Sequence, residues 1–392
     1  MARNTKKTIQ SCGGLEQYLA ETNSSTWKKN HNDRTCNEAY QEIKKNLKQI
    51  QETVISGAMS ESIHDALNTY KEQLKDICVE EENETRMRKV HELFSSDPVV
   101  FLNDHGPDHN EKVIERADAI VSCFKNEHLS EFEVFLLLSA VQIHDIGNIL
   151  GRAGHEKKLG DIFDENCSTI IPDVPERRVI KNIAMAHGGK SILGKDTISL
   201  LSTSEHIFNS LVRTRLLAAI LRFADELADD SSRANRAAIN LGILSTDSRI
   251  YHDYSRALHT VNIVEDLMNN DLKVSLVYEL ETEALRDTYQ VGGCDKFLLD
   301  EIYDRTLKME VERRYCMKFM HPYISIGRID VSINIYGKTS ERIQTISYTL
   351  EDVSYPETPI AGQIKAGWKI DVPSGEELLK TMIKRGVIND EK

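Results

Sequence analysis

The N-terminal part of the chain carries apolar residues at helical spacing within a polar sequence. The two sets with this spacing are Ala39, Ile43, Leu47 and Ile50, and Ile63, Leu67, Tyr70 and Leu74. The acidic run at 80–84 is typical of a solvated boundary. We therefore expect residues 1–90 to form a helical extension.

The central part of the chain is more apolar. Residues 132–141 are apolar on nearly every side of a helix, which indicates a buried helix, and residues 216–224 have a similar pattern. The pattern predicts a helical domain over residues 91–245, with the main core inside it.

After about residue 246, apolar and polar residues begin to alternate, as they do in strands. The expected strands are 261–264, 272–278, 329–335 and 343–350, with a charged helix from about Asp295 to Met320 between the two pairs and a short helix at 376–384. This order predicts a two-layer α/β domain over residues 246–392. The fold class is therefore mainly α, with an α/β C-terminal domain that serves regulation or oligomerisation.

The charged helix carries many acidic and basic residues. We expect a solvated face with i,i+4 pairs, such as Glu310 with Arg314. A subunit interface or an effector pocket is the alternative for these charges.

Composition limits the class of protein. No stretch approaches 18 uninterrupted apolar residues, so we expect no membrane span, and no apolar segment follows the basic start at residues 1–7, so we expect no signal peptide. The seven cysteines form no Cys-x-x-Cys pair, which favours free thiols and a cytoplasmic location.

The formal net charge of −13 argues against binding of duplex nucleic acid. It allows a small anionic substrate, because a metal ion can reverse the local field in an acidic protein.

The central segment places imidazoles and carboxylates at positions where a core normally has apolar residues. They are His109, His144, Asp145, His187 and Asp225. A single inward histidine is more often a satisfied core residue, but a bare buried carboxylate costs several kcal/mol. Four helices that each direct such a group inward are best explained by a shared divalent ion of Mn, Mg, Fe, Co, Ni or Zn.

The order His109, His144-Asp145 and Asp225 resembles the four-ligand signature of the HD superfamily of metal-dependent phosphohydrolases. The local contexts His-x-x-x-Val, His-Asp-Ile-Gly and Phe-Ala-Asp-Glu-Leu are similar as well, and the resemblance covers about residues 95–240. Residues 104–109 and 225–233 particularly resemble HD modules of bacterial conflict systems. That similarity implies a role in antiviral defence.

The resemblance implies that His109, His144, Asp145 and Asp225 are metal ligands. His155 and His187 are the candidates for holding a second ion, so one or two ions are expected. Asp145 is also the candidate proton acceptor, and His155 or His187 the candidate proton donor, because imidazole titrates near neutrality.

Basic residues near these positions could neutralise phosphate groups. The candidate substrate contacts are His105, Arg152, Lys157, Lys158, Lys190 and Arg233. For each of them taken singly, the alternative interpretation is an ordinary surface residue without a role in substrate binding.

The expected activity is hydrolysis of a nucleotide, with a (deoxy)nucleoside triphosphate triphosphohydrolase as the preferred form. The alternatives are a phosphodiesterase for cyclic nucleotides or oligonucleotides, a di-iron oxygenase, and a nucleotide-sensing scaffold without turnover. The scaffold would signal through the α/β domain, where residues 329–350 offer a long sheet edge. By analogy with the family, we expect a homo-oligomer and a nucleotide effector.

Overall fold

The computed structural model describes residues 8–22, 27, 34–53, 107–125, 128–150, 155–189, 194–229, 246–266, 271–291, 293–351 and 372–388. These residues form two compact units. The first contains the described residues within 8–53, 107–228 and 314–325, and the second those within 229–313 and 326–388. The expected division of the chain at residues 90 and 245 stays a prediction.

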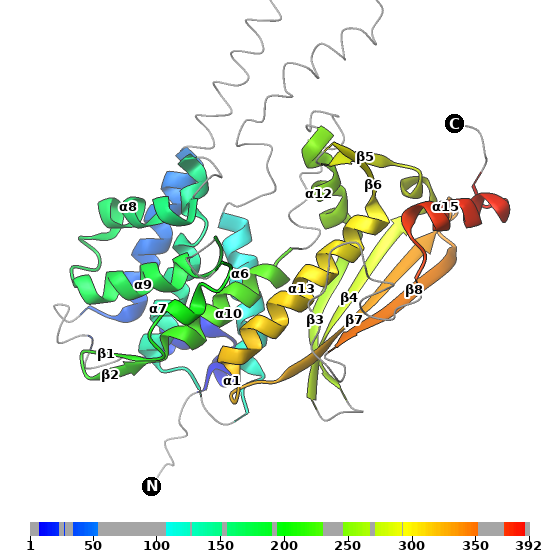
Figure 1. Ribbon diagram of the computed structural model, residues 1–392. Coiled ribbons are helices and arrows are strands. Elements are labelled where there is room, and N and C mark those ends of the chain that lie inside the picture. Colours follow the sequence, from blue (N-terminus) through cyan, green and yellow to red (C-terminus); the bar gives the residue numbers. More distant parts are fainter. Residues whose placement is uncertain are drawn as a thin grey trace, which may run out of the picture. The chain divides into compact units, whose positions relative to one another are not determined.

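The first unit is helical apart from one small hairpin (Figure 1). Its elements are α1 (Ile9–Cys12), α2 (Leu15–Glu21), a helix at 36–53, α6 (Pro107–Ser122), α7 (Glu131–Ile143), η2 (Ile146–Leu150), α8 (His155–Cys167), α9 (Val174–Met185), η3 (Ile198–Leu200), β1 (Glu205–Ile207), β2 (Ser210–Val212), α10 (Thr214–Leu227) and the last residues of α13 (Leu298–Met320).

Helix α7 forms the centre of this unit. Twelve of its thirteen residues are buried, as its apolar sequence predicts. Helices α2, α6, α9 and α10 all contact it. The helix at 36–53 also follows the predicted pattern, since Ala39, Ile43 and Leu47 are fully buried. The second predicted N-terminal set, at 63–74, lies outside the described residues.

A buried ion pair fixes the start of α7. Ser130 and Glu133 form a capping box at its N-terminus. Arg213, which precedes α10, donates from Nε to Oε1 of Glu133 and from Nη2 to Oε2, both over 2.8 Å. The Glu133 side chain is 3% exposed, and its partner is 15% exposed. Burial by itself raises the pKa of Glu133, but the contacts with Arg213 outweigh burial and lower the pKa below its usual value.

The second unit is built on a four-stranded sheet in the order β3-β4-β7-β8. Its elements are α12 (Thr246–Ala257), β3 (Leu258–Asp266), β4 (Asp271–Glu281), η5 (Thr282–Leu285), β5 (Thr288–Val291), β6 (Cys294–Phe297), most of α13, β7 (Ile326–Tyr336), β8 (Arg342–Glu351) and α15 (Gly375–Lys384). The two expected strand pairs are confirmed as the antiparallel pairs β3-β4 and β7-β8. Strands β4 and β7 join the pairs in parallel.

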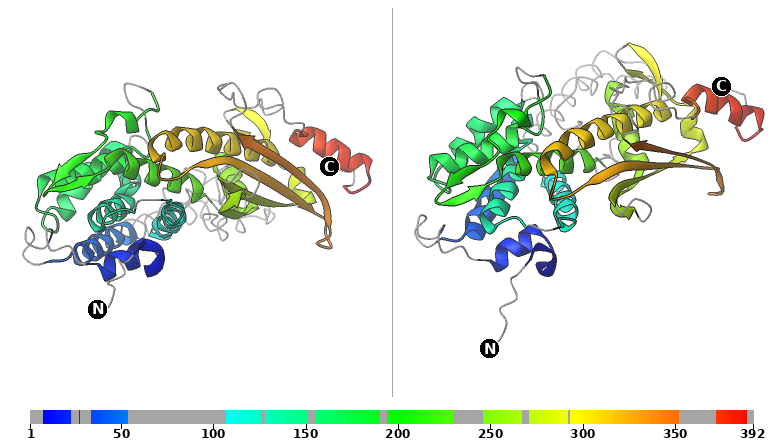
Figure 2. Two further views of the ribbon diagram at one scale, coloured as in Figure 1. Left: turned by 90° about the horizontal axis from the view of Figure 1, so that it is seen from below. Right: turned by 60° about the horizontal axis from the view of Figure 1, so that its bottom comes forward.

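Helices cover one face of the sheet, which confirms the two-layer α/β arrangement (Figures 1 and 2). Thr306 on α13 lies 2.7 Å from the Tyr348 hydroxyl on β8, and Tyr254 on α12 lies 3.2 Å from the Tyr278 hydroxyl on β4. The opposite face is polar, with Lys273 paired to Asp330 at 2.8 Å. Apolar residues on one side of each strand therefore form the core beneath the helices.

Three details of this unit differ from the sequence-based expectation. The charged helix begins at Leu298, because Asp295 belongs to β6. Helix α12 and the short β5-β6 hairpin were not predicted. The pair of Glu310 and Arg313 is buried, at 0% and 3% exposure, so the expectation of a solvated face is wrong here. The Arg313 guanidinium donates to Glu310 and to the carbonyl of Ile326, which compensates its charge in the interior.

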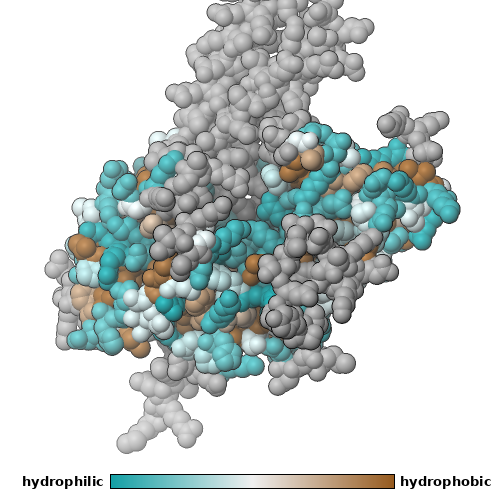
Figure 3. All heavy atoms as spheres, viewed as in Figure 1, coloured by the Kyte–Doolittle hydropathy of each residue, from teal (hydrophilic) through white to brown (hydrophobic). Residues whose placement is uncertain are grey.

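On the face shown in Figure 3, hydrophilic residues predominate over both units, with hydrophobic residues scattered among them. None of the helices that the structure describes is both long and apolar enough to cross a membrane. The six described cysteines are free thiols, as predicted.

Replacement of Glu133 by glutamine should destabilise the first unit. It leaves the buried guanidinium of Arg213 without its charge partner, which costs about 3 kcal/mol. Since the pKa of Glu133 is lowered by folding, the wild-type contribution to stability is present above the usual glutamate pKa of 4.5 and is lost as the pH falls below it. Urea unfolding followed by circular dichroism at several pH values measures both effects.

The matched control for this prediction is Glu205→Gln. Its partner Arg178 is 57% exposed, so the same chemical change should cost less than about 1 kcal/mol. If both variants lost the same free energy of unfolding, the result would contradict a special role of the pair of Glu133 and Arg213.

Candidate metal centre

His109 enters the interior from the first turn of α6. Pro107 starts the helix, where its missing N–H costs no hydrogen bond and its fixed φ suits a helix. His109 is 2% exposed and lies on the same side as the buried residues Val113 and Ala117. The apolar stripe predicted from the sequence therefore carries this imidazole inward.

His144 and Asp145 follow directly after the last residue of α7. The last carbonyl groups of a helix have no intrahelical partner. His144 uses one of them, because its Nδ1 donates to the carbonyl of Val141 over 2.8 Å. That bond fixes the ring orientation and leaves Nε2 as the atom presented to the cluster.

His187 has the same arrangement at the end of another helix. It lies two residues beyond the end of α9, and its Nδ1 donates to the carbonyl of Ala184 over 2.5 Å. Its Nε2 lies 3.5 Å from Oδ1 of Asp145. Two helix ends therefore present imidazole Nε2 atoms toward one carboxylate.

Asp225 comes from α10 and faces the first two histidines. Its Oδ1 lies 3.1 Å from Nε2 of His109 and 3.6 Å from Nε2 of His144. Oδ2 of Asp145 lies 3.8 Å and 3.6 Å from the same two nitrogens. The structure thus brings together all five polar residues that the sequence places on apolar helices. The two oxygens of Asp145 face different neighbours, since Oδ2 faces His109 and His144 and Oδ1 faces His187.

The charges in this cluster shift the pKa values of its members. Burial lowers the pKa of His144, but the neighbouring charges of Asp145 and Asp225 outweigh burial and raise it to about 9. Burial by itself would raise the pKa of Asp225, whereas the contacts with His109 and His144 hold it well below its usual range. The carboxylates therefore attract positive charge, and a proton on His144 competes with a metal ion for this place.

His109, His144 and Asp145 form a buried group that could hold a metal ion. One ligand atom from each lies within 4.8 Å of the other two. Ligand atoms about 2.1 Å from one ion lie roughly 3 to 4 Å apart, and the distances of 3.1 to 3.8 Å between the histidine nitrogens and the carboxylate oxygens fit this range. Nε2 of His144 is buried, has no hydrogen-bond partner among the described residues, and has its nearest carboxylate oxygens at 3.6 Å. An ion would satisfy this atom, and the mixed nitrogen and oxygen donors suit Mn, Fe, Co, Ni, Zn or Mg.

The structure does not join the other candidate residues to the cluster. His105, Arg152, Lys190 and Arg233 lie outside the described residues. His155 and Lys157 belong to the first turn of α8, but their side chains are outside the description, and Lys158 is partly exposed on the same turn. Their roles stay predictions.

Sequence reasoning missed Arg222, whose guanidinium donates to Thr197, the residue that in turn donates to the carbonyl of Ala186 beside His187. Arg222 is 6% exposed and interrupts the apolar run of α10 one turn before Asp225. A single guanidinium in such a run was the available signal, because a buried charge requires polar partners.

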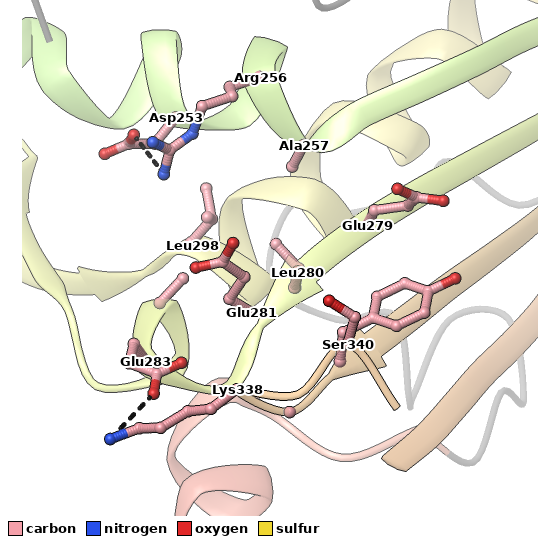
Figure 4. Close-up of a pocket in the computed structure, with 13 residues that line it drawn as sticks. Asp253, Arg256, Ala257, Glu279, Leu280, Glu281, Glu283, Leu298, Lys338 and Ser340 are labelled. Carbon is pink, nitrogen blue, oxygen red and sulfur yellow. Dashed lines mark ion pairs between the residues drawn. The ribbon is translucent and has the colours of Figure 1, made fainter. Parts of the chain in front are cut away.

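A separate pocket of about 760 Å³ lies in the second unit (Figure 4). Ion pairs between Arg256 and Asp253 and between Lys338 and Glu283 lie in its wall, at 3.2 Å and 3.6 Å. The described residues that line it include no imidazole, so they do not reproduce the donor set found in the first unit.

Comparison with known proteins adds one finding. Among curated proteins and among solved structures, none matches this chain. The model of the HD-CE family matches residues 97–308, which is more than half of the 392 residues and includes the whole cluster. The predicted resemblance to HD domains is confirmed, and the chain belongs to the HD-CE family.

Proposed function

We propose that this protein is a metal-dependent nucleotide phosphohydrolase with its ion held by His109, His144, Asp145 and Asp225. The observation that carries the proposal is the buried cluster itself, in which neighbouring nitrogen and oxygen atoms lie 3.1 to 3.8 Å apart around the unpartnered Nε2 of His144. Membership of the HD-CE family supports an HD-type hydrolase.

When bound, a divalent ion supplies Lewis acidity toward a phosphoryl oxygen and lowers the pKa of water. The protein's part is to orient the reactants and to move protons. Asp145 directs Oδ2 toward His109 and His144, and we assign it the role of proton acceptor. The Nδ1 hydrogen of His187 is used by Ala184, so any proton that this ring gives to a leaving oxygen comes from Nε2.

The number of ions decides the role of His187. Oδ1 of Asp145 lies 3.5 Å from its Nε2, whereas Oδ2 faces the other two histidines, and these separate contacts of the two oxygens favour a second ion position shared by Asp145 and His187. With two ions, His187 would be a ligand and His155 the proton donor. With one ion, His187 itself would be the donor.

We propose a (deoxy)nucleoside triphosphate as the substrate, with Arg152, Lys157, Lys158, Lys190 and Arg233 around its phosphates and His105 as a further contact. The second candidate is a phosphodiesterase for cyclic nucleotides or oligonucleotides, which the separated oxygens of Asp145 favour, because such enzymes use two ions. A role in antiviral defence, a homo-oligomeric state and a nucleotide effector belong to the same proposal.

Replacement of either residue at the end of α7 should remove the ion. We expect His144→Ala and Asp145→Ala to lose bound metal and to lower hydrolysis at least about a hundredfold, since even residues that only support a ligand contribute ten- to a hundredfold. Metal analysis of the purified chains, with circular dichroism to verify folding, measures this. His206→Ala is the matched control, because His206 is an exposed histidine of the same unit. A folded His144→Ala chain with wild-type metal content would show that the site is misassigned.

A nucleotide panel should identify the reaction. A triphosphohydrolase releases inorganic tripolyphosphate and a nucleoside, whereas a phosphodiesterase releases a nucleoside monophosphate or opens a cyclic substrate. Chromatography of products formed with Mn²⁺, Mg²⁺ or Co²⁺, in air and without oxygen, separates these outcomes. We expect tripolyphosphate from at least one triphosphate, equal rates without oxygen, and no turnover by Asp145→Ala. A fully metal-loaded chain that hydrolyses none of the nucleotides would instead support a sensor.

A further inference from the structure

His187 depends on neighbouring segments for its position. It lies beyond the end of α9 and is followed by Gly188 and Gly189, and the latter has a φ of 74°. Glycine in this left-handed region allows a sharp turn but does not itself restrict the backbone. The hydrogen bonds of residues 186 and 187 therefore help to determine where this imidazole lies, together with its contact with the ring of His144.

One such bond comes from Thr197, which lies in the segment just before η3. Its Oγ1 donates to the carbonyl of Ala186, the residue directly before His187, over 2.7 Å. The same hydroxyl accepts a hydrogen bond of 2.9 Å from Nη1 of Arg222, which also donates to the carbonyl of Lys195 over 3.1 Å. A chain of hydrogen bonds thus runs from α10 through Thr197 to the backbone beside His187.

Tyr315 holds the same segment from another side. Its hydroxyl accepts from the backbone N–H of Ile198 over 2.9 Å and donates to Asp196 over 2.7 Å. The Arg222 guanidinium lies 4.6 Å from the centre of the Tyr315 ring, within the range of a cation–π contact. The aromatic ring therefore contacts the guanidinium that bonds to Thr197.

The position of Arg222 connects this support to the cluster. It lies on α10 three residues before Asp225, so the two side chains lie on adjacent turns of one helix. The helix that carries one carboxylate of the cluster therefore also anchors, through Arg222, the segment that fixes His187.

We propose that Arg222 and Thr197 are positioning residues that hold Nε2 of His187 toward Oδ1 of Asp145. Their effect on metal binding rests on the proposed function, whereas their effect on the ring of His187 does not. The bond from Thr197 fixes the backbone at Ala186, and the bond from Nδ1 of His187 to Ala184 then keeps the Nδ1-protonated form. Without Thr197, this ring should sample other orientations while His144 keeps its own helix-end bond.

Thr197→Val tests the inference, because valine has nearly the same shape as threonine but cannot donate or accept these bonds. Nitrogen-15 spectra of labelled histidine in the full chain with Zn²⁺ report which ring nitrogen carries hydrogen, and His187→Ala assigns the signal. We expect the His187 signal to shift toward a mixture of forms in Thr197→Val and in Arg222→Met, with His144 still carrying its hydrogen on Nδ1. In the same two variants we expect one ion fewer per chain and about a tenfold lower kcat, the lower range for residues that orient ligands.

Two controls separate positioning from general stability. Thr197→Ser keeps the hydroxyl and should restore the wild-type signal. Arg215→Lys alters another arginine of α10, whose contacts are the carbonyls of Leu201 and Ser199, farther along the segment, and it should leave His187 unchanged. A folded Thr197→Val chain with the wild-type His187 signal would overturn the inference.

The ring signal tests the inference about His187, and the metal content of the wild-type chain tests the proposed function, so the two proposals can be contradicted separately. A wild-type chain that binds no ion and hydrolyses nothing contradicts the proposed function, and the His187 signal alone then decides the inference. If the wild-type chain binds a single ion, there is no second ion position. The ring signal and kcat of the variants then test the inference about His187.

Discussion

The structure of the helical unit depends on how the negative charges of two carboxylates, Asp145 and Asp225, are balanced by neighbouring groups. Asp145 is 6% exposed, and the side chain of Asp225, which is 26% exposed, faces the same two residues, His109 and His144. Several kcal/mol would be lost if such charges had no partner. The helices that meet here therefore need a positive charge between them, and α6, α7 and α10 all place side chains of the cluster around it.

The sequence predicted the members of this cluster because each polar residue interrupts an apolar helical stripe. Asp225 on α10 and His109 on α6 are examples, since their apolar neighbours three and four residues away show which side faces the core. The sequence could not predict which oxygen of Asp145 faces which histidine. That choice depends on the directions in which α7 and α9 end, and these are set by tertiary packing.

In the C-terminal unit, too, local sequence patterns predicted the elements but not the contacts between elements that are distant in the chain. Alternation along the chain predicted the strands of β3-β4 and β7-β8, because each strand has one apolar face. The parallel contact of β4 with β7 joins residues about 55 positions apart, as in the pair of Val274 and Ile329, and no local pattern encodes it. The burial of Glu310 against Arg313 was missed for a similar reason, since a charged pair on a helix has the same pattern whether it faces water or a sheet.

Residues 314–325 have a consequence for any attempt to isolate the helical unit. They belong to that unit although they lie between the two strand pairs of the sheet in the chain, and they supply Tyr315 and Tyr323, whose rings lie 4.6 and 4.8 Å from the guanidinium groups of Arg222 and Arg213. A fragment cut where the family match ends, at residue 308, would lack both rings. The helical unit is thus discontinuous in sequence, and its boundaries follow from tertiary contacts that a linear domain definition does not contain.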